Sequence, residues 1–194
     1  MRIHRLLSVS RVNGPGSRFV VWVQGCSRQC SGCFNPATHD HRGGYELEVS
    51  EIVRQIPLTE VIGITVSGGE PFEQPEELEA LLEKTRQMGL NRLVYSGFTH
   101  EELKEQGNRI VERCLPLIDI LIDGAYEKEI PAKMPWTGSG NQRVIELRNG
   151  QVQNILEEGE LEASGIFDGE LIIDSAGGIT ATGIMDSGKL AEEH

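Results

Sequence analysis

Four short apolar runs constrain the fold of this chain more than any other feature of the sequence. Each has the length of a strand, is too short for a helix, and ends in a Gly-, Ser- or Cys-containing loop. They cover residues 19–23, 61–66, 92–95 and 118–122. Helical patterns lie between them, and strand and helix alternate four times. This alternation predicts an α/β fold with a parallel sheet and right-handed crossovers.

The helices between these runs are predicted from their end signals. Ser50 suits an N-cap before an apolar stripe, and Pro75 suits the first turn of the next helix. Gly89 is a good residue just past the end of that helix. Thr99 and Glu102 have the spacing of a capping box, which predicts a helix that continues irregularly to residue 115.

The pattern changes after residue 124. Residues 125–140 resemble a loop, and residues 142–148 form a predicted strand. Asn149 and Gly150 predict a hairpin turn, and a second hairpin is expected from the apolar stretches 171–173 and 179–182 around Gly177 and Gly178. We therefore divide the chain into a core of residues 1–148 and a small β-rich extension of residues 149–194.

Composition excludes several classes of protein. The chain has 194 residues and a formal net charge of −12, so it offers no basic surface for nucleic acid or an anionic membrane. No segment has the pattern of a signal peptide or a membrane span, which predicts a cytoplasmic protein. Of the four cysteines, three are clustered and Cys114 stands alone, so a disulfide framework is not expected. Cys114 is interpreted as a small buried apolar residue.

The clustered cysteines form a C-x3-C-x2-C motif directly after the first strand. Cys26, Cys30 and Cys33 can converge on one metal centre, and thiolates select zinc, copper(I) or iron–sulfur clusters. His39 or His41 could complete a structural zinc site. Without a histidine ligand, one coordination position stays open, as chemistry at the metal requires.

A second motif, Gly68-Gly69-Glu70-Pro71, follows the next strand. Taken alone, it is an ordinary strand-to-helix turn in which the glycines supply positive φ. Ligands of parallel α/β proteins bind at the carboxyl ends of the strands, so the cysteine loop and this loop are expected to face each other. The two motifs together, in this order and on successive strands, are a much more specific signal for a functional site than either motif alone.

C-x3-C-x2-C followed one strand later by G-G-E-P resembles the radical S-adenosylmethionine (SAM) superfamily. Within it, the chain is most similar to the activating proteins of the anaerobic (class III) ribonucleotide reductase. The resemblance covers roughly residues 18–146. It rests on both motifs, with Gly32 before the third cysteine, and on Tyr95-Ser96-Gly97-Phe98, the segment 121–126 and the segment 138–143.

This resemblance implies a set of cofactors and site residues. Cys26, Cys30 and Cys33 would hold three irons of one 4Fe-4S cluster, and SAM would chelate the fourth iron. The methionyl end of SAM would be lined by Gly68, Gly69, Glu70 and Pro71. Ser96, Asp123 and Asn141 would help to complete the SAM pocket, although Asp123 can equally be read as a cap on the turn after its strand.

The resemblance also implies an activity and partners. Reductive cleavage of SAM would give a 5′-deoxyadenosyl radical, which takes a hydrogen from a glycine of a partner enzyme. An external one-electron donor such as flavodoxin or ferredoxin would supply the electron. The implied fold is a partial (β/α) barrel, because 194 residues with a β extension are too few for eight β/α units.

Two alternatives stay open at this point. One is a radical SAM enzyme that modifies another peptide or a small molecule, and the other is a non-catalytic iron–sulfur or zinc protein for electron transfer or interaction. Reductase activases tend to end soon after the segment that resembles residues 141–146, so the extension puts the partner in doubt. The extension could recognise a different partner, cover the open side of the barrel or simply extend the core.

Overall fold

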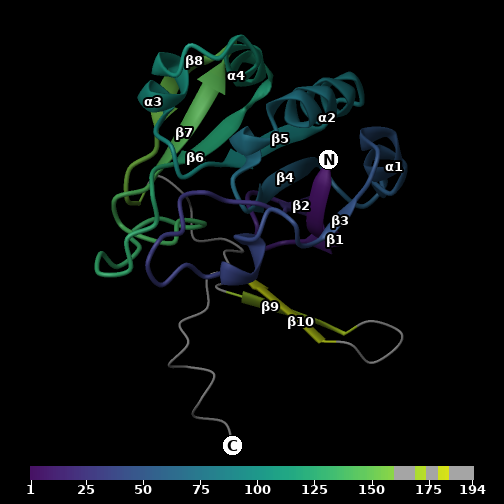
Figure 1. Cartoon of the computed structure of the whole chain (residues 1–194), viewed down its shortest axis with the longest axis horizontal. Coiled ribbons are helices and arrows are strands. Elements are labelled where there is room, and N and C mark those ends of the chain that lie inside the picture. The colour runs from purple at the N-terminus through teal and green to yellow at the C-terminus, as the bar shows by residue number, and fades with distance from the viewer. Residues whose placement is uncertain (160–168, 174–178, 184–194) are drawn as a thin grey trace, which may run out of the picture.

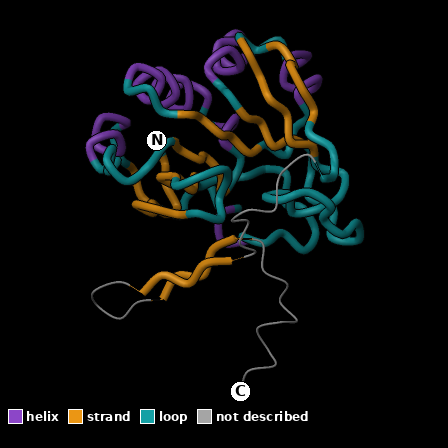
Figure 2. Tube along the Cα trace, turned by 180° about the vertical axis from the view of Figure 1, so that it is seen from behind, coloured by secondary structure: helices purple, strands orange, loops and turns teal. Residues whose placement is uncertain are grey.

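The computed structural model of the chain describes residues 1–159, 169–173 and 179–183. Its centre is an eight-stranded mixed sheet in the order β3-β1-β2-β4-β5-β6-β7-β8. Figure 1 and the reverse view in Figure 2 show the helices on one face of this sheet. Long loops and a separate two-stranded sheet, β9 and β10, lie on the other face. The predicted mixture of helices and strands in an α/β fold is confirmed.

The four predicted strands form the parallel centre of the sheet. They are β2 (Arg18–Val23), β4 (Gly63–Gly68), β5 (Asn91–Tyr95) and β6 (Ile120–Asp123), paired in that order. Their apolar side chains are almost wholly buried, because helices cover one face of the sheet and loops cover much of the other. Because these four strands are parallel, their carboxyl ends all lie at one edge of the sheet.

Antiparallel strands extend this centre on both sides. β1 (Arg2–Ser10) pairs with β2 and with the short β3 (Tyr45–Glu46), and β7 (Arg143–Arg148) pairs with β6 and with β8 (Gln151–Ile155). β1 was not expected from the sequence. Arg2, His4 and Arg5 interrupt its apolar pattern, yet Ile3 is fully buried and β2 supplies the hydrogen-bonding partner.

The helices start and end largely where their signals predicted. They are α1 (Val49–Arg54), α2 (Pro75–Gln87), α3 (His100–Glu105) and α4 (Arg109–Cys114), with three short 3-10 turns at Pro36–Thr38, Pro71–Glu73 and Leu115–Leu117. Thr99 and Glu102 form the predicted capping box. The N-cap of α1 is Glu48 rather than Ser50, because Glu48 and Glu51 form the reciprocal pair. The irregular stretch after α3 is a break at Gly107 (φ 64°) between two helices.

The first predicted hairpin is present, and the two strands predicted for the second one pair with each other. Asn149 and Gly150 have positive φ and join β7 to β8. β8 is therefore part of the main sheet, which continues to Ile155, whereas the boundary predicted at residue 149 would separate β8 from the strand that it pairs with. β9 (Gly169–Ile173) and β10 (Ile179–Gly183) pair in antiparallel register, and the turn predicted at Gly177 and Gly178 lies outside the described residues.

The core lies between the sheet and its helices. The largest buried side chains there come from both layers and include Phe19, Ile64, Leu78, Leu82 and Leu103. Cys114 is fully buried in this core, as expected. Within the described ranges, no helix has both the length and the apolar character needed to cross a membrane.

Candidate cofactor site

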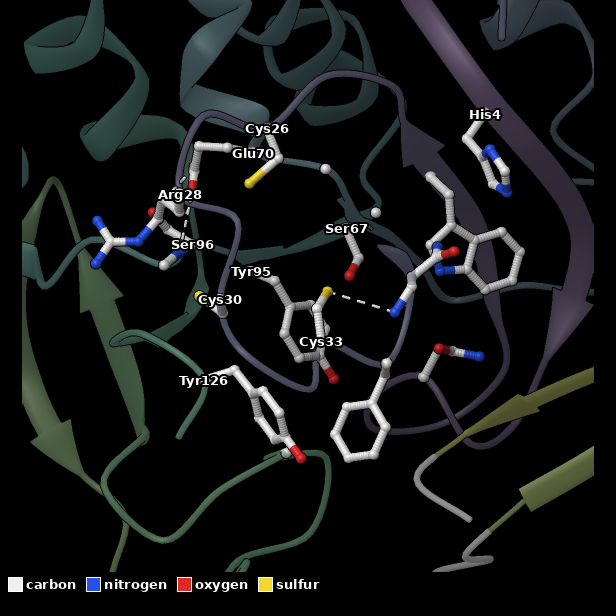
Figure 3. A pocket seen from close by; sticks show the side chains of 18 of the residues that line it. His4, Cys26, Arg28, Cys30, Cys33, Ser67, Glu70, Tyr95, Ser96 and Tyr126 are labelled. Atoms are coloured by element: carbon white, nitrogen blue, oxygen red, sulfur yellow. Dashed lines mark hydrogen bonds between the residues drawn. The ribbon is translucent and has the colours of Figure 1, made fainter. Parts of the chain in front are cut away.

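A cavity of about 380 Å³ lies at the carboxyl ends of the parallel strands. This volume falls in the range of about 300–1,000 Å³ that is usual for sites of small molecules and cofactors. Figure 3 shows side chains from the loops after β2, β4 and β5 around the same space. The cavity is lined by residues of both sequence motifs: Cys26, Cys30, Cys33, Gly68, Gly69 and Glu70. The prediction that the two loops face each other is confirmed.

The cysteine loop is held at both ends by hydrogen bonds to the residues around it. After β2, Gln24 is buried, and its side-chain amide donates to the carbonyl oxygens of Ala37 (3.0 Å) and Asp40 (2.7 Å). Gly25 N donates to Thr38 O at 2.8 Å. These bonds close the loop over residues 26–37 and fix the cysteines relative to the sheet.

The three thiols are free and partly buried. Burial raises the pKa of the Cys26 and Cys33 thiols, because the loss of hydration destabilises the charged thiolate more than the neutral thiol. A metal bound here would have to displace these protons, as thiolate ligands always require.

The geometry does not form a structural zinc site. Among the described residues, no three His, Cys, Asp or Glu side chains lie close enough together to bind one metal ion. His41 Nε2 is instead 2.8 Å from Glu73 Oε2. An iron–sulfur cluster differs from a single ion in that each cysteine binds its own iron, so its ligands can be spread around a cluster-sized space.

Two polar atoms at the cavity, unpaired within the described part of the chain, indicate that it suits a polar ligand. Arg28 Nε and His39 Nε2 are buried, belong to residues that line the cavity, and have no hydrogen-bond partner among the described residues. Buried polar atoms are nearly always paired, so these atoms fit a group that the protein alone does not supply. The thiols, these atoms and the volume all suit an iron–sulfur cluster with a second, polar cofactor.

Glu70 joins the ends of two strands at this cavity. Its carboxylate accepts hydrogen bonds from Phe72 N (3.1 Å), Ser96 Oγ (3.0 Å) and Gly97 N (2.8 Å). The side chain is almost wholly buried, and burial raises its pKa to about 7 although the three hydrogen bonds act in the opposite direction. Glu70 thus connects the loop after β4 to the loop after β5.

Gly69 allows the two motif loops to touch. Its N–H donates to Val23 O, and Glu70 N donates to Gly25 O, each at 2.8 Å. A Cβ atom on residue 69 would collide with the carbonyl oxygen of Gly25, which is next to Cys26. A glycine is required here because two backbones approach each other closely.

The other residues predicted for the SAM pocket differ in position. Ser96 lines the cavity, whereas Pro71, Asp123 and Asn141 are not among the residues that line it. Pro71 is buried at the start of a 3-10 turn. Asn141 Nδ2 donates to Ala125 O at 2.7 Å, and its buried Oδ1 has no partner among the described residues.

The Asp123 carboxylate is fully buried and bonded to other groups of the protein. It accepts hydrogen bonds from Arg143 Nε (2.9 Å) and from His100 N (2.7 Å), and Arg143 Nη2 also contacts it. Arg143 in turn pairs with Glu101, which holds the pKa of that carboxyl down at about 2. These contacts favour the structural interpretation of Asp123, as a residue that fixes the end of β6.

The contacts of Asp123 lead to a testable expectation. Asp123→Asn removes the charge that faces Arg143, and we expect it to lower the free energy of unfolding by about 2 kcal/mol. SAM affinity, measured by equilibrium dialysis on the cluster-loaded protein, should change by less than about threefold, because the carboxylate does not face the cavity. Asp40→Asn, at an exposed position, is the matched control and should leave stability nearly unchanged. A large loss of SAM affinity without loss of stability would instead support a direct contact between Asp123 and SAM.

Several residues at the cavity were not expected from the sequence. Arg28, between the first two cysteines, lies 4.5 Å from the centre of the Phe98 ring. The rings of Phe34 and Tyr126 pack in a tilted arrangement with centres 4.7 Å apart, and Trp22 and Trp136 also line the cavity. Phe34 and Tyr126 adjoin or lie in segments that carry the family resemblance, and Arg28 lies inside the cysteine motif, but these positions alone predict no place at the cavity. No short motif marks Trp22 and Trp136.

Comparison with known proteins identifies the class of this site. Residues 12–145 match the family described as a 4Fe-4S single cluster domain. This match covers more than half of the chain and contains both motifs.

Curated relatives narrow the class further. The anaerobic ribonucleoside-triphosphate reductase-activating protein of Enterobacteria phage T4 is 33% identical over 157 residues, which cover 77% of this chain and 97% of that protein. The protein of the same name from Vibrio cholerae is 32% identical, over 73% of this chain and 96% of its own length. The pyruvate formate-lyase-activating enzyme of Clostridium pasteurianum is 37% identical over 99 residues, which cover 48% of this chain and 42% of that enzyme.

This chain belongs to the family of anaerobic ribonucleoside-triphosphate reductase-activating proteins. It is accordingly a radical SAM enzyme of the glycyl-radical-activating type, and its cofactors are a 4Fe-4S cluster and SAM. The predicted family, activity and cofactors are confirmed, and a non-catalytic zinc or electron-transfer protein is excluded.

Proposed function

We propose that this chain generates a glycyl radical on an anaerobic ribonucleotide reductase. The name shared by relatives that it covers almost completely supports this substrate. The observation that carries the proposal is the single cavity into which the three-cysteine loop and the Gly-Gly-Glu loop both open.

The cluster and SAM have separate places in this proposal. Cys26, Cys30 and Cys33 would hold three irons, which would leave the fourth iron for SAM. The methionyl end of SAM would lie against Gly68, Gly69 and Glu70, with Ser96 beside it, while Pro71, which does not line the cavity, would hold the turn that follows this loop. The buried acid and the backbone carbonyl groups of this loop suit a cationic ammonium group.

A cluster held at Cys26, Cys30 and Cys33 and reduced by one electron from an external donor would supply, together with SAM at the Gly-Gly-Glu loop, the radical chemistry that takes a hydrogen atom from the partner's glycine. The chain itself positions these groups and keeps water away from them. Glu70 holds the loops after β4 and β5 together, and the aromatic side chains of Trp22, Tyr95 and Tyr126 line the reaction space. Tyr95 is fixed by its hydroxyl, which donates to Trp136 O at 2.9 Å.

The fold proposed for this function is a partial (β/α) barrel. The parallel strands β2, β4, β5 and β6, with helices on one face, support it. A sheet that is not closed leaves room for a glycine loop of the partner to reach the cavity. The electron comes from an external donor such as flavodoxin or ferredoxin, and the free thiols favour a reducing compartment such as the cytoplasm.

Formation of the glycyl radical is the decisive test. The protein is reconstituted anaerobically with iron and sulfide, reduced with dithionite and mixed with SAM and the anaerobic ribonucleotide reductase of the same organism. Electron paramagnetic resonance should show a glycyl radical on the reductase and none on pyruvate formate-lyase, which serves as the alternative partner. SAM cleavage with no radical on either enzyme would instead favour modification of another peptide or small molecule.

A further inference from the structure

The hairpin formed by β9 and β10 lies against the cavity, although it is far from both motifs in the sequence. The family match ends at residue 145, so the hairpin is outside the matched region. Figures 1 and 2 show it on the face of the sheet that the helices leave uncovered. Three residues of β10, Ala181, Thr182 and Gly183, line the same cavity as the cysteines.

Thr182 is the buried residue among the hairpin positions whose burial the structure describes. Its exposed fraction is 7%, whereas Ala181 and Gly183 on either side are exposed, although they also line the cavity. The Thr182 side chain therefore packs against the protein, while its two neighbours leave this end of β10 open to solvent. Figure 3 shows the two yellow strands beside the cavity, on the same side as His4 and away from Arg28 and Ser96.

Among the residues that the structure describes, two hydrogen bonds join the hairpin to the loop after β1. Asn13 Nδ2 donates to Thr182 Oγ1 at 2.9 Å, and Arg11 N donates to Glu170 Oε2 at 3.3 Å. Asn13 is itself held in the core, because its Nδ2 also donates to Ser10 Oγ (2.8 Å) and its carbonyl oxygen accepts from Thr65 Oγ1 (2.6 Å). The position of β10 is thus connected to the interior of the main sheet through buried polar groups.

We propose that the β9–β10 hairpin is a wall of the reaction cavity, anchored by the buried Thr182, and that it restricts entry to a narrow peptide loop arriving from the side of Tyr126. This inference rests on the proposed function, since it assigns the route by which the partner's glycine reaches the cavity. Phe34, beside Tyr126, has an exposed fraction of 58%, so that side is open to solvent and apolar. The hairpin also keeps water and other hydrogen donors out on the side of Asn13.

The attachment can be tested without any cofactor. In the full-length apo protein, Thr182→Val with Glu170→Ala removes both hydrogen bonds, which should shift the equilibrium toward the detached hairpin by about 30-fold. A detached two-stranded hairpin is marginally stable in water, so amide hydrogen exchange of residues 179–183 should accelerate about tenfold or more. Thr59→Val with Glu60→Ala, two exposed residues in the turn before β4, is the matched control and should leave this exchange unchanged. Equal exchange in both variants would overturn the proposed attachment.

The role of the wall is tested on the loaded protein. Binding of SAM to the reconstituted wild type should slow amide hydrogen exchange in residues 179–183 and leave amide exchange in β8 unchanged. If exchange in residues 179–183 did not slow, the proposal that the hairpin is a wall of the cavity would be overturned. In the Thr182→Val, Glu170→Ala variant, the ratio of 5′-deoxyadenosine to glycyl radical formed on the reductase should rise at least about threefold, because more radicals are lost to other donors. An unchanged ratio would overturn the restriction of entry. Failure of the wild type to form any glycyl radical would count against the proposed function, and the apo-protein result would still decide the attachment.

Discussion

Cys30→Ala is expected to abolish formation of 5′-deoxyadenosine, with a loss of at least about a thousandfold relative to the wild type. Cys30 is the middle ligand of the proposed cluster, and the other two thiols of the motif cannot hold three irons. The loop offers no replacement, because Gln29 and Ser31 on either side are not ligands of iron in such clusters. Iron and sulfide content after anaerobic reconstitution measures the loss of the cluster. Chromatography of the nucleoside product separately measures the loss of 5′-deoxyadenosine formation.

Cys114→Ala is the matched control for this variant. Cys114 is buried under α2, where its Sγ lies 3.5 Å from Pro75 O, and burial raises the pKa of its thiol to about 12. We expect normal cluster content and activity with a loss of stability of about 1 kcal/mol. If Cys30→Ala retained cluster and activity, the assignment of the motif as the ligand set would be wrong.

Gly69→Ala is expected to impair both stability and SAM binding. The added Cβ would collide with the backbone carbonyl of Gly25, and a backbone obstacle cannot rotate away as a side chain can. The collision should lower the free energy of unfolding by about 3 kcal/mol, measured by urea denaturation of the apo protein. It should also push the Gly-Gly-Glu loop away from Cys26 and weaken SAM binding at least about tenfold, since cofactor binding depends on geometry at this scale.

Gly89→Ala separates the two effects of Gly69→Ala. Gly89 follows α2 with a φ of 76° and has no atom near the position of a Cβ. This variant should therefore lose about 1 kcal/mol through backbone strain and keep its SAM affinity. Unchanged SAM binding in Gly69→Ala would show that the close contact between the loops is not needed for the site.

The main elements of the fold were predictable because their signals are local. Apolar runs of strand length, the capping box at Thr99 and Glu102 and the turn at Asn149 and Gly150 each depend on neighbouring residues. β1 was missed because its pattern is broken by charged residues, and only the pairing with β2 stabilises it as a strand. The N-cap of α1 was misplaced by two residues, since a Glu48–Glu51 pair is a less common cap than a serine.

The sequence by itself determined the candidate ligands, their spacing and the loops that carry them, because the cysteines and the Gly-Gly-Glu loop each follow a strand whose direction the alternating pattern predicts. The tertiary structure alone decided which side chains turn toward the cavity. Asp123 follows a parallel strand as the motifs do, yet it is buried against Arg143, while Thr182 reaches the cavity from a hairpin more than a hundred residues away from the cysteines. The local sequence pattern predicts the direction of each strand. The orientation of a polar side chain depends instead on the distant partner that satisfies its hydrogen bonds.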